Sequence, residues 1–543
     1  MIGSPTQNSC INSERLKVKY RYKLAIREAK TSSIRDNSDQ INASLVNKDP
    51  SSFWKCWKSI YDKRNLTRSP PLIDNFSDHR VIAESFRTHF KDSFINSSDH
   101  TDAKNEFTDL LSHLHHDKSD IHTFQIEDVD GAVNQLALNK AVDMDELVGE
   151  HLFYSHPSIL LHLKNLFNIM MSHSYVPHSF TVGIITPIVK DARGDLSSPT
   201  NYRPITISSV ISKVFEYLIL NRFSPLFSSD MLQFGYKPSM GCPNAIFLLR
   251  RVIQHFNDNS SNVYMASIDA SKAFDRVNHF KLFSILIKQG LPKFIILLFV
   301  NWYSRLSVKV KWGSSFSSTL NVLSGVRQGG ILSGVFFNLY VNKIITSLRE
   351  KDLGCHLGNM FAGAIMYADD LMLLSSSVVD LQAMLMICDT VGKELGIKFN
   401  PSKSKCMYIG PNLNIYPVDL LLGQSLLPWV TELFYLGITL IRAKSFIIDL
   451  SCIRRKFFVS VNVILSKCNF TSDIVKLNLL ESHCLPILLY ASECLYLPKF
   501  QLVELNSWWN CVYRKIFGYN KWESVRHLIC LLGRLDLFHI INR

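Results

Sequence analysis

Two adjacent aspartates interrupt an apolar run. Asp369 and Asp370 lie in the segment IMYADDLMLL at 365–374, with hydrophobic residues on both sides. A buried carboxylate is costly unless a cation or hydrogen-bond donors stabilise it. The pair taken alone has two explanations: a solvated hairpin turn, where Asp is common, or a set of metal ligands.

A third acid ends another apolar segment. The stretch NVYMASID at 262–269 is predicted to be a strand that finishes at Asp269. Two neighbouring strands would bring Asp269, Asp369 and Asp370 together. Carboxylate oxygens are the natural ligands of Mg²⁺, which proteins usually hold with one or two carboxylates plus substrate phosphates. Two such ions could bind the attacking and leaving oxygens of an in-line phosphoryl displacement, which is the chemistry of nucleotide addition.

The surrounding pattern mixes strands and helices without a regular alternation, which indicates an α+β domain followed by a helical C-terminal unit. It predicts strands over 182–191, 262–269 and 307–312, helices over 211–223, 279–289 and 332–348, and a strand–turn–strand over 364–374. The clean alternation of 307–312 favours an exposed strand. Residues 75–125 have weak periodicity and are expected to be partly loop, after a linker at 68–74. Beyond about residue 445 the pattern is mainly helical.

Size and composition bound the class of protein. The chain has 543 residues, with 47% hydrophobic and 19% charged, so we expect a globular protein of two to four structural units. The 12 cysteines include no C-x-x-C pair and no zinc-finger spacing, which favours free, buried cysteines. A metal site in HLHHD at 113–117 is less favoured than a solvated segment. Trp508 and Trp509 could stack on nucleic acid, but core packing is the preferred interpretation.

The net charge of +13 is concentrated at the N-terminus. Residues 1–70 contain 14 Lys or Arg against 6 Asp or Glu, and a basic helix is predicted around Leu16, Tyr20 and Leu24. A basic surplus favours a polyanionic partner such as nucleic acid; the alternative is a basic surface with no specific partner. The longest apolar stretch, 294–300, is too short to span a bilayer, and no signal peptide opens the chain. We therefore expect an intracellular protein with no membrane partner.

An ordered set of motifs resembles reverse transcriptases. SIDASKAFDRVNH, SGVRQGGILSGVFFNLYVN and MYADDLMLLS resemble the three central palm motifs, in the version of non-LTR, jockey-like (LINE-like) retrotransposons. NYRPITISSVISKVFEYLILNRF resembles a fingers motif, and GIKFNPSKSKCMYIG and FYLGITL resemble the last palm motifs. CLPILLYASE and the segment from RKIFGYNKW onward resemble the thumb. The resemblance runs from about residue 125 to the end and implies a right-hand polymerase fold with fingers, an antiparallel-sheet palm and a helical thumb.

The resemblance also implies roles for individual residues. It assigns Asp269, Asp369 and Asp370 as catalytic metal ligands for two Mg²⁺ ions, for which Mn²⁺ could substitute, and Asp275 as a structural acid. Tyr367 would line the primer end. The nucleotide-binding residues would be Lys190, Arg203, Phe274, Gln328, Gly329 and Lys403.

Among these, Phe274 would lie beneath the sugar and exclude a 2′-hydroxyl, and its alternative is an ordinary core aromatic. Lys190 and Arg203 would face the triphosphate, and their alternative is a surface salt bridge. Gln328 and Gly329 would pack against the incoming nucleotide and the template base. Lys403 would neutralise or protonate the leaving pyrophosphate.

Two segments depart from the family pattern. Ser333–Gly334 stands where relatives usually have Ser-Pro, and we expect Ser333 to cap a helix whose start Gly334 loosens. The segment KAVDMDELVGE at 140–150 replaces the usual KAxGPDG and lacks its Gly and Pro turn residues. This second departure concerns the loop at the start of the fingers and leaves the metal site untouched.

The expected organisation is a basic N-terminal extension at 1–124, fingers at 125–260, a palm at 261–445 and a thumb at 446–543. The expected function is that of an RNA-directed DNA polymerase, with an RNA template, a DNA primer or target and dNTPs as partners, acting in the nucleus or the cytoplasm. The alternative is a catalytically inactive nucleic-acid-binding remnant of such an element. An RNA-dependent RNA polymerase is disfavoured by Phe274 and by the Tyr-Ala pair before the two acids.

Overall fold

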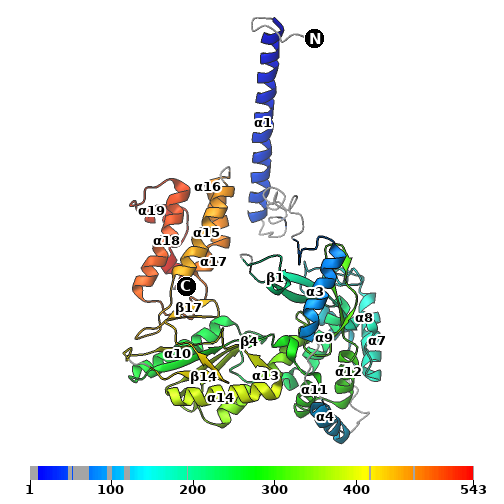
Figure 1. Cartoon of the computed structure of the whole chain (residues 1–543). Coiled ribbons are helices and arrows are strands. Elements are labelled where there is room, and N and C mark those ends of the chain that lie inside the picture. The colour runs from blue at the N-terminus through cyan, green and yellow to red at the C-terminus, as the bar shows by residue number, and fades with distance from the viewer. Residues whose placement is uncertain are drawn as a thin grey trace. The chain divides into compact units, whose positions relative to one another are not determined.

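The computed structural model describes residues 10–46, 52, 72–94, 101–114, 123–191, 194–414, 417–468 and 471–541. The expected linker at 68–71 and residues 115–117 of the HLHHD segment lie outside these ranges. The chain divides into two compact units, Pro70–Ile448 and a second unit made of Asp449–Arg543 with Met1–Ser69. Figure 1 labels the elements of both units.

A four-stranded antiparallel sheet contains the predicted strands that carry the acids. Its order is β10 (Ala364–Tyr367), β11 (Asp370–Ser375), β3 (Val263–Ile268) and β13 (Lys405–Ile409). The central strand β3 reads VYMASI and is almost wholly buried, as expected for a strand with neighbours on both edges and helices packed against it. The helices α10 (Cys242–Asp258) and α14 (Val378–Leu395) pack against this sheet. The strand–turn–strand prediction is therefore confirmed.

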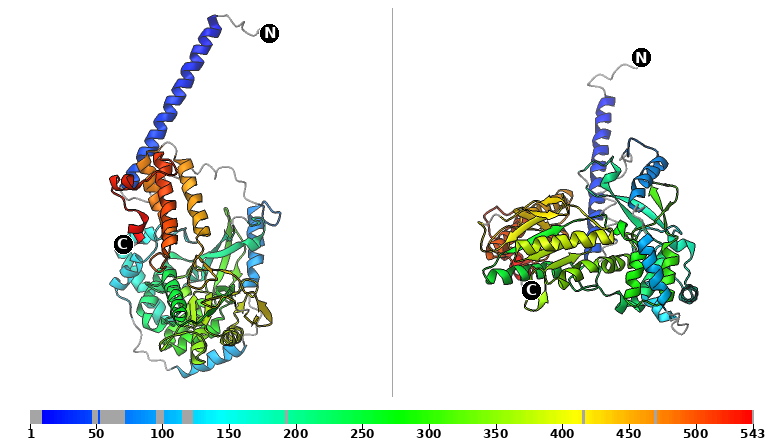
Figure 2. Two further views of the ribbon diagram at one scale, coloured as in Figure 1. Left: turned by 90° about the vertical axis from the view of Figure 1, so that its left-hand side faces the viewer. Right: turned by 60° about the horizontal axis from the view of Figure 1, so that its bottom comes forward.

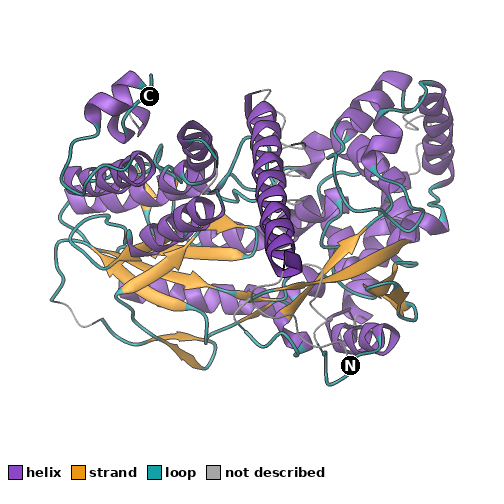
Figure 3. Cartoon of the chain, turned by 90° about the horizontal axis from the view of Figure 1, so that it is seen from above, coloured by secondary structure: helices purple, strands orange, loops and turns teal. Residues whose placement is uncertain are grey.

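The second large sheet contains β1 (Val182–Val189), β2 (Tyr202–Ile207), β5 (Ser307–Trp312), β6 (Ser315–Phe316) and β7 (Leu320–Asn321). Figure 3 shows both sheets in orange among the purple helices. The prediction that 307–312 forms a strand is confirmed, but the prediction that it is exposed is wrong. β5 pairs with β1 on one side and with β6 and β7 on the other, and α3 packs against it, so half of its side chains are buried.

The prediction that 75–125 is partly loop misses two helices, α3 (His79–Phe94) and α4 (Thr101–His113). In α3, Ile82, Phe86 and Phe90 recur every four residues and are 0–2% exposed. Phe86 contacts Trp312 of β5, with ring centroids 5.1 Å apart. This spacing is the apolar stripe of an amphipathic helix and is present in the sequence, but it covers only a few turns of a polar segment with weak periodicity elsewhere. Packing on the sheet stabilises the helix.

One long helix connects several others. α13 (Ile331–Glu350) contacts α14, which packs on the four-stranded sheet, and also contacts α9 (Val210–Arg222) and α11 (His279–Lys288) (Figure 1). Among the described residues α13 is the one helix long and apolar enough to cross a bilayer, and 67% of the apolar window is buried inside the protein. Its side chains therefore form part of the core.

The loop at 140–150 is ordered by a buried aspartate. Asp143 Oδ1 accepts the backbone N–H groups of Asp145 (2.9 Å) and Leu147 (2.8 Å), and its Oδ2 accepts that of Val210 (2.8 Å) at the start of α9. Glu146 takes the left-handed conformation, at φ 58°. The carboxylate of Asp143 thus supplies the turn contacts that Gly and Pro would otherwise favour.

The second unit is helical, as predicted. Its C-terminal part contains α15 (Ser451–Lys467), α16 (Asp473–His483), α17 (Leu485–Leu488), α18 (Lys499–Phe517), α19 (Arg526–Leu531) and α20 (Leu537–Ile541). Trp508 and Trp509 are 6% and 0% exposed, which confirms their core role. The N-terminal basic helix is also confirmed, as α1 (Cys10–Val46), a single helix in both views of Figure 2. The ten cysteines from Cys242 to Cys530 are free, and five of them are buried.

Candidate active site

The three acids lie at the ends of adjacent paired strands. The turn Tyr367–Asp370 joins β10 to β11, and Tyr367 pairs with Asp370 across it. Leu371 of β11 pairs with Ile268 of β3, so one further step in the same antiparallel register sets Asp370 opposite Asp269. The hairpin and the metal-site explanations of the aspartate pair are thus compatible.

Backbone contacts fix the position of Asp269 from a separate part of the chain. The Asp269 N–H donates to Ser404 Oγ (3.2 Å), and the Asp269 carbonyl accepts the Asn400 N–H (2.8 Å). Lys403 Nζ lies 3.7 Å from Asp269 Oδ2. The predicted pyrophosphate lysine is therefore within reach of the first acid.

The carboxylates influence one another electrostatically. Partial desolvation by the surrounding protein raises the pKa of Asp369, and the charge of Asp269 raises it further, while Arg203 opposes the rise. Desolvation and the charges of Asp369 and Asp269 raise the pKa of Asp370 to about 6. Within the described ranges no three His, Cys, Asp or Glu side chains already converge closely enough to coordinate an ion, so the acids must turn toward one another to share one.

Cations face the acids from the other sheet. Lys190 follows β1, and Arg203 on β2 pairs with Ile188. Lys190 Nζ donates to the Thr200 carbonyl (2.8 Å). The pKa of Lys190 is lowered by desolvation and then by the positive charges of Lys272, Arg203 and Lys403, which shows that these cations are neighbours.

The loop before α13 is held against β2. The Thr206 N–H donates to the Gln328 carbonyl (2.9 Å), and Gln328 Nε2 donates to Asp275 Oδ1 (2.9 Å). Gly329 has φ 126°, and a Cβ there would lie 2.4 Å from the Thr206 carbonyl oxygen, so only glycine fits. Asp275 is 4% exposed, and its burial raises its pKa to about 6.

An aromatic stack lies beside the acids. The Phe274 ring lies 4.2 Å from that of Phe337 on α13, with an interplanar angle of 13°. Its other neighbour is Tyr236, edge to face at 5.7 Å. Desolvation and the charge of Asp369 raise the pKa of Tyr236. Tyr367 is half-buried, beside Cys242 and Tyr236.

The prediction of a helix over 332–348 is confirmed, but the prediction that Ser333 caps it is wrong. The helix begins at Ile331 with Gly330 as N-cap, so Ser333 lies inside the first turn. The buried carboxylate of Glu216, on α9, accepts the Leu332 N–H (2.9 Å) and satisfies this helix end from outside the helix. Burial raises the pKa of Glu216, and Arg327 and the backbone donors oppose that rise.

Gly334 has a steric role that the sequence did not reveal. A Cβ at this position would lie 2.4 Å from Tyr236 Cγ. Tyr236 is itself in the left-handed region, at φ 54°, and is 55% exposed. The glycine therefore leaves room for a half-exposed aromatic ring next to Phe274.

All ten predicted site residues thus lie in one connected neighbourhood of the unit Pro70–Ile448. Sequence reasoning missed Gln233, Tyr236 and Lys272. Lys272 stands within the motif SIDASKAFDRVNH, and Gln233 and Tyr236 belong to the segment QFGYKPSMG at 233–241, but only tertiary contacts reveal what these side chains touch. The sequence offered one signal for Gln233 and Tyr236: a polar and a large aromatic residue in a loop that contains Gly and Pro.

Residues 189–440 match the family described as "Reverse transcriptase (RNA-dependent DNA polymerase)", and this segment forms a reverse transcriptase domain. The similar proteins belong to non-LTR elements. The chain is 26% identical over 248 residues to the "Retrovirus-related Pol polyprotein from type-2 retrotransposable element R2DM" of Drosophila melanogaster, covering 46% of this chain and 23% of that protein.

Two further relatives extend the match along the chain, both named as probable RNA-directed DNA polymerases and both from Drosophila melanogaster. The protein from transposon X-element is 26% identical over 442 residues, which cover 77% of this chain and 47% of the relative. The protein from transposon BS is 26% identical over 418 residues, which cover 73% and 44%. The chain therefore spans less than half the length of these relatives. The resemblance to non-LTR reverse transcriptases is confirmed.

Proposed function

We propose that this chain is an RNA-directed DNA polymerase of a non-LTR retrotransposon, which adds dNTPs to a primer 3′-hydroxyl on an RNA template. The observation that carries this proposal is the juxtaposition of three carboxylates, at the ends of β3 and β11, with a group of cations from β1 and β2. Acids and cations on facing sides suit a metal–triphosphate substrate.

The donor set fits divalent cations. Asp269, Asp369 and Asp370 would hold two Mg²⁺ ions, or Mn²⁺ in their place, since the mutual repulsion that raises the pKa of Asp369 and Asp370 is relieved by a cation. Bound ions would activate the 3′-hydroxyl and stabilise the charge that develops on the phosphoryl oxygens. Asp370, with its pKa of about 6, is ionised and available as a ligand at neutral pH.

The cations would bind and orient the triphosphate. Arg203 can hold two phosphate oxygens with its planar guanidinium, and Lys190 and Lys272 add positive charge nearby. Lys403, 3.7 Å from Asp269, would neutralise the leaving pyrophosphate or donate a proton to it. Desolvation and then the neighbouring positive charges lower the pKa of Lys190, and a bound polyanion would neutralise that cluster of charge.

The remaining residues would select and position the nucleotide. The Phe274 ring, supported by Phe337, would exclude a 2′-hydroxyl. Gln328 and Gly329 would pack against the incoming nucleotide and the template base, because their loop is fixed to β2 through Thr206. Tyr367 would line the primer end.

In this proposal the fingers comprise 125–260, the palm 261–445 and the thumb 446–543, after a basic extension at 1–124. The partners are element RNA as template and DNA as primer or target. The site of action would be the nucleus, the cytoplasm or both.

The test is extension of a DNA primer on an RNA template with Mg²⁺ and dNTPs. Wild type should extend the primer, and Asp369→Ala should not. Asp258→Asn, at an exposed acid on α10, is the matched control and should behave as wild type. Failure of folded wild-type protein to incorporate dNTPs would contradict the proposal, and equal activity of Asp369→Ala would contradict the metal assignment.

A parallel reaction with rNTPs tests the role of Phe274. Phe274→Val should raise rNTP incorporation relative to dNTP incorporation. The same reactions decide the second candidate function, an inactive nucleic-acid-binding remnant, which the cluster of cations alone would also allow. Tight binding of primer–template without incorporation of either nucleotide would favour that remnant.

A further inference from the structure

The segment Leu232–Tyr236 runs beside the strand that leads into the acid turn. Gln233 forms a parallel bridge with Met366 of β10. The Phe234 N–H donates to the Met366 carbonyl (2.8 Å), and the Met366 N–H donates to the Leu232 carbonyl (2.9 Å). The segment therefore forms a β-bridge along the outer edge of the hairpin that carries the acids.

The side chain of Gln233 reaches the turn itself. Its Oε1 accepts the Ala368 N–H (3.0 Å) and the Gly235 N–H (3.0 Å), and its Nε2 donates to the Ala368 carbonyl (3.3 Å). Gln233 is 1% exposed. One buried amide thus bonds both backbone polar groups of the residue that precedes Asp369.

Ala368 needs this support because its backbone is strained. It lies in the left-handed region, at φ 56°, which costs a residue with a Cβ free energy and persists only where surrounding contacts enforce it. Ala368 is also buried, so its N–H and carbonyl would be costly to leave without partners. The amide of Gln233 satisfies both groups in that conformation.

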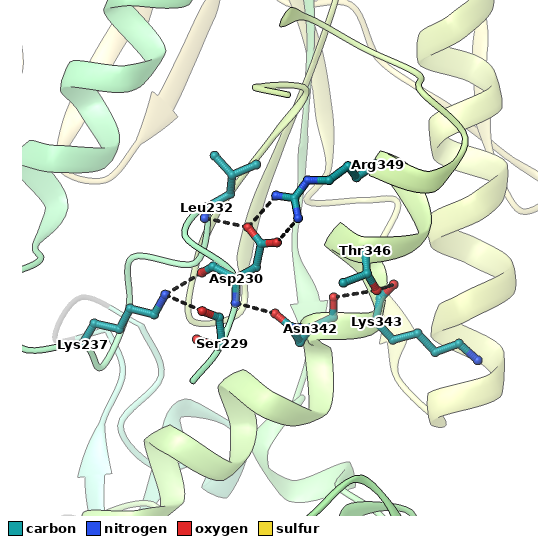
Figure 4. A network of polar contacts seen from close by, with 8 residues as sticks. All are labelled: Ser229, Asp230, Leu232, Lys237, Asn342, Lys343, Thr346 and Arg349. Atoms are coloured by element: carbon teal, nitrogen blue, oxygen red, sulfur yellow. Dashed lines mark hydrogen bonds and ion pairs between the residues drawn. The ribbon is translucent and has the colours of Figure 1, made fainter. Parts of the chain in front are cut away.

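The segment is in turn fixed to α13. Gly235 approaches so closely that a Cβ there would lie 2.5 Å from the Ala368 nitrogen, and Asn338 Nδ2 donates to the Gly235 carbonyl (2.6 Å). Figure 4 shows the flanking network, in which Arg349 binds the Asp230 carboxylate with both terminal nitrogens and Lys237 donates to the Ser229 carbonyl (3.0 Å). Asn342 Oδ1 accepts the Asp230 N–H (2.7 Å).

We propose that Gln233 is a positioning residue for the metal-binding acids: its amide fixes the peptide groups on both sides of Ala368 and so sets the direction of the Asp369 and Asp370 carboxylates. This inference rests on the proposed polymerase function for its catalytic consequence but not for its geometry. Glutamine suits the role because it offers a donor and an acceptor without charge. Glutamate would lose the donor and add a fourth carboxylate near three others.

Two variants separate the positioning role from packing. Gln233→Leu fills a similar volume without hydrogen bonds, and Gln233→Glu keeps the acceptor alone. The matched control is Gln501→Leu, at a glutamine on α18 that is 4% exposed. All three are made in the full chain, and circular dichroism and thermal unfolding establish which of them fold.

Two readouts do not depend on turnover. Hydrogen exchange followed by mass spectrometry should show faster exchange in the peptide around 365–370 for both Gln233 variants and no change there for Gln501→Leu. Calorimetric titration with Mn²⁺ alone should give binding about 10-fold weaker than wild type for the Gln233 variants. Unchanged exchange and unchanged Mn²⁺ affinity in a folded Gln233 variant would overturn the inference, whether or not the wild type polymerises.

A third readout applies to active wild-type protein. The maximal rate of single-nucleotide addition should fall by about 10- to 100-fold in Gln233→Leu, with a higher Mg²⁺ concentration at half-maximum, while primer–template affinity stays at the wild-type value. Gln501→Leu should keep the wild-type Mg²⁺ dependence. A loss of primer–template affinity in Gln233→Leu at unchanged Mg²⁺ dependence would overturn the positioning role. Wild-type protein that binds Mn²⁺ without polymerising would contradict the proposed function and leave the exchange and titration results to decide on Gln233.

Discussion

The acids and the cations of the site are held in different ways. The acid turn at 367–370 is fixed by the antiparallel ladder with β3, by the Gln233 amide and by the close approach of Gly235. Lys190 and Arg203 are exposed side chains on the hairpin of β1 and β2, where the described polar contacts of the Lys190 ammonium are local, such as that to Thr200. Metal ligands must be placed within fractions of an ångström, whereas a triphosphate responds to the summed charge around it, so rigidity is concentrated where geometry matters most.

The largest effect should come from removing one acid while keeping its shape. Asp269→Asn should lower the rate of dNTP addition by about 1,000-fold, because several kcal/mol of metal-dependent stabilisation is lost. Single-turnover primer extension measures this. Asp258→Asn is the surface control, and a loss below about 10-fold for Asp269→Asn would contradict its assignment as a ligand.

A cation should matter less and should affect substrate binding more than the maximal rate. Arg203→Ala should raise the KM for dNTP by about 10- to 100-fold. This is the loss of affinity expected when the charged hydrogen bonds of one guanidinium to phosphate are removed. Arg203→Lys should recover part of this loss, since it restores the charge without the planar guanidinium. Steady-state kinetics measure the KM, with Arg251→Ala, a substitution at an exposed arginine, as the control. An unchanged KM for Arg203→Ala would contradict the assignment of Arg203 to the triphosphate site.

The contact between Gly334 and Tyr236 tests whether the aromatic stack beside the acids is as rigid as the acid turn. Gly334→Ala should lower the free energy of unfolding by about 1–2 kcal/mol, because the added Cβ would lie 2.4 Å from the Tyr236 ring. Adding Tyr236→Ala should relieve most of this loss, and a double-mutant cycle by chemical denaturation measures the coupling. Additive effects of the two substitutions would show that the ring moves aside freely.

The smallest effect concerns Asp275, the buried acid that accepts a hydrogen bond from Gln328. Its pKa of about 6 is above the unfolded value of 3.8, so ionisation costs the folded state stability as pH rises between these two values. Asp275→Asn does not titrate and retains an acceptor for Gln328. The stability of this variant relative to wild type should therefore rise by about 1 kcal/mol between pH 5 and pH 7.5. Denaturant titrations at the two pH values measure this, and a constant difference would contradict the raised pKa.

The sequence predicted what local pattern and motif order encode. Periodicity predicted the strands around Asp269 and Asp369, the helix at 332–348 and the helical C-terminal unit. The family resemblance predicted that the ten site residues belong to one site. Periodicity did not predict α3, whose short apolar stripe lies in a polar segment, or the burial of β5, which depends on its sheet neighbours.

The contacts around the start of α13 show the same limit. Ser333 looked like a helix cap because Ser is a good local cap, but a carboxylate from α9, more than 100 residues away in the chain, caps that end. Gln233 and Gly334 have roles defined wholly by tertiary neighbours. The roles assigned to the site residues by resemblance stay predictions until the variants are measured.

The contacts spaced along α13 have a consequence for how the chain can change. Its first turn is capped from α9, its middle supports Phe274 through Phe337, and its last turn binds Asp230 through Arg349. An α-helix turns by about 100° per residue, so a single inserted or deleted residue within 331–349 would rotate every later contact away from its partner. A loop can change in length without moving such contacts. The number of residues in α13 between its first and last contacts is therefore expected to be fixed.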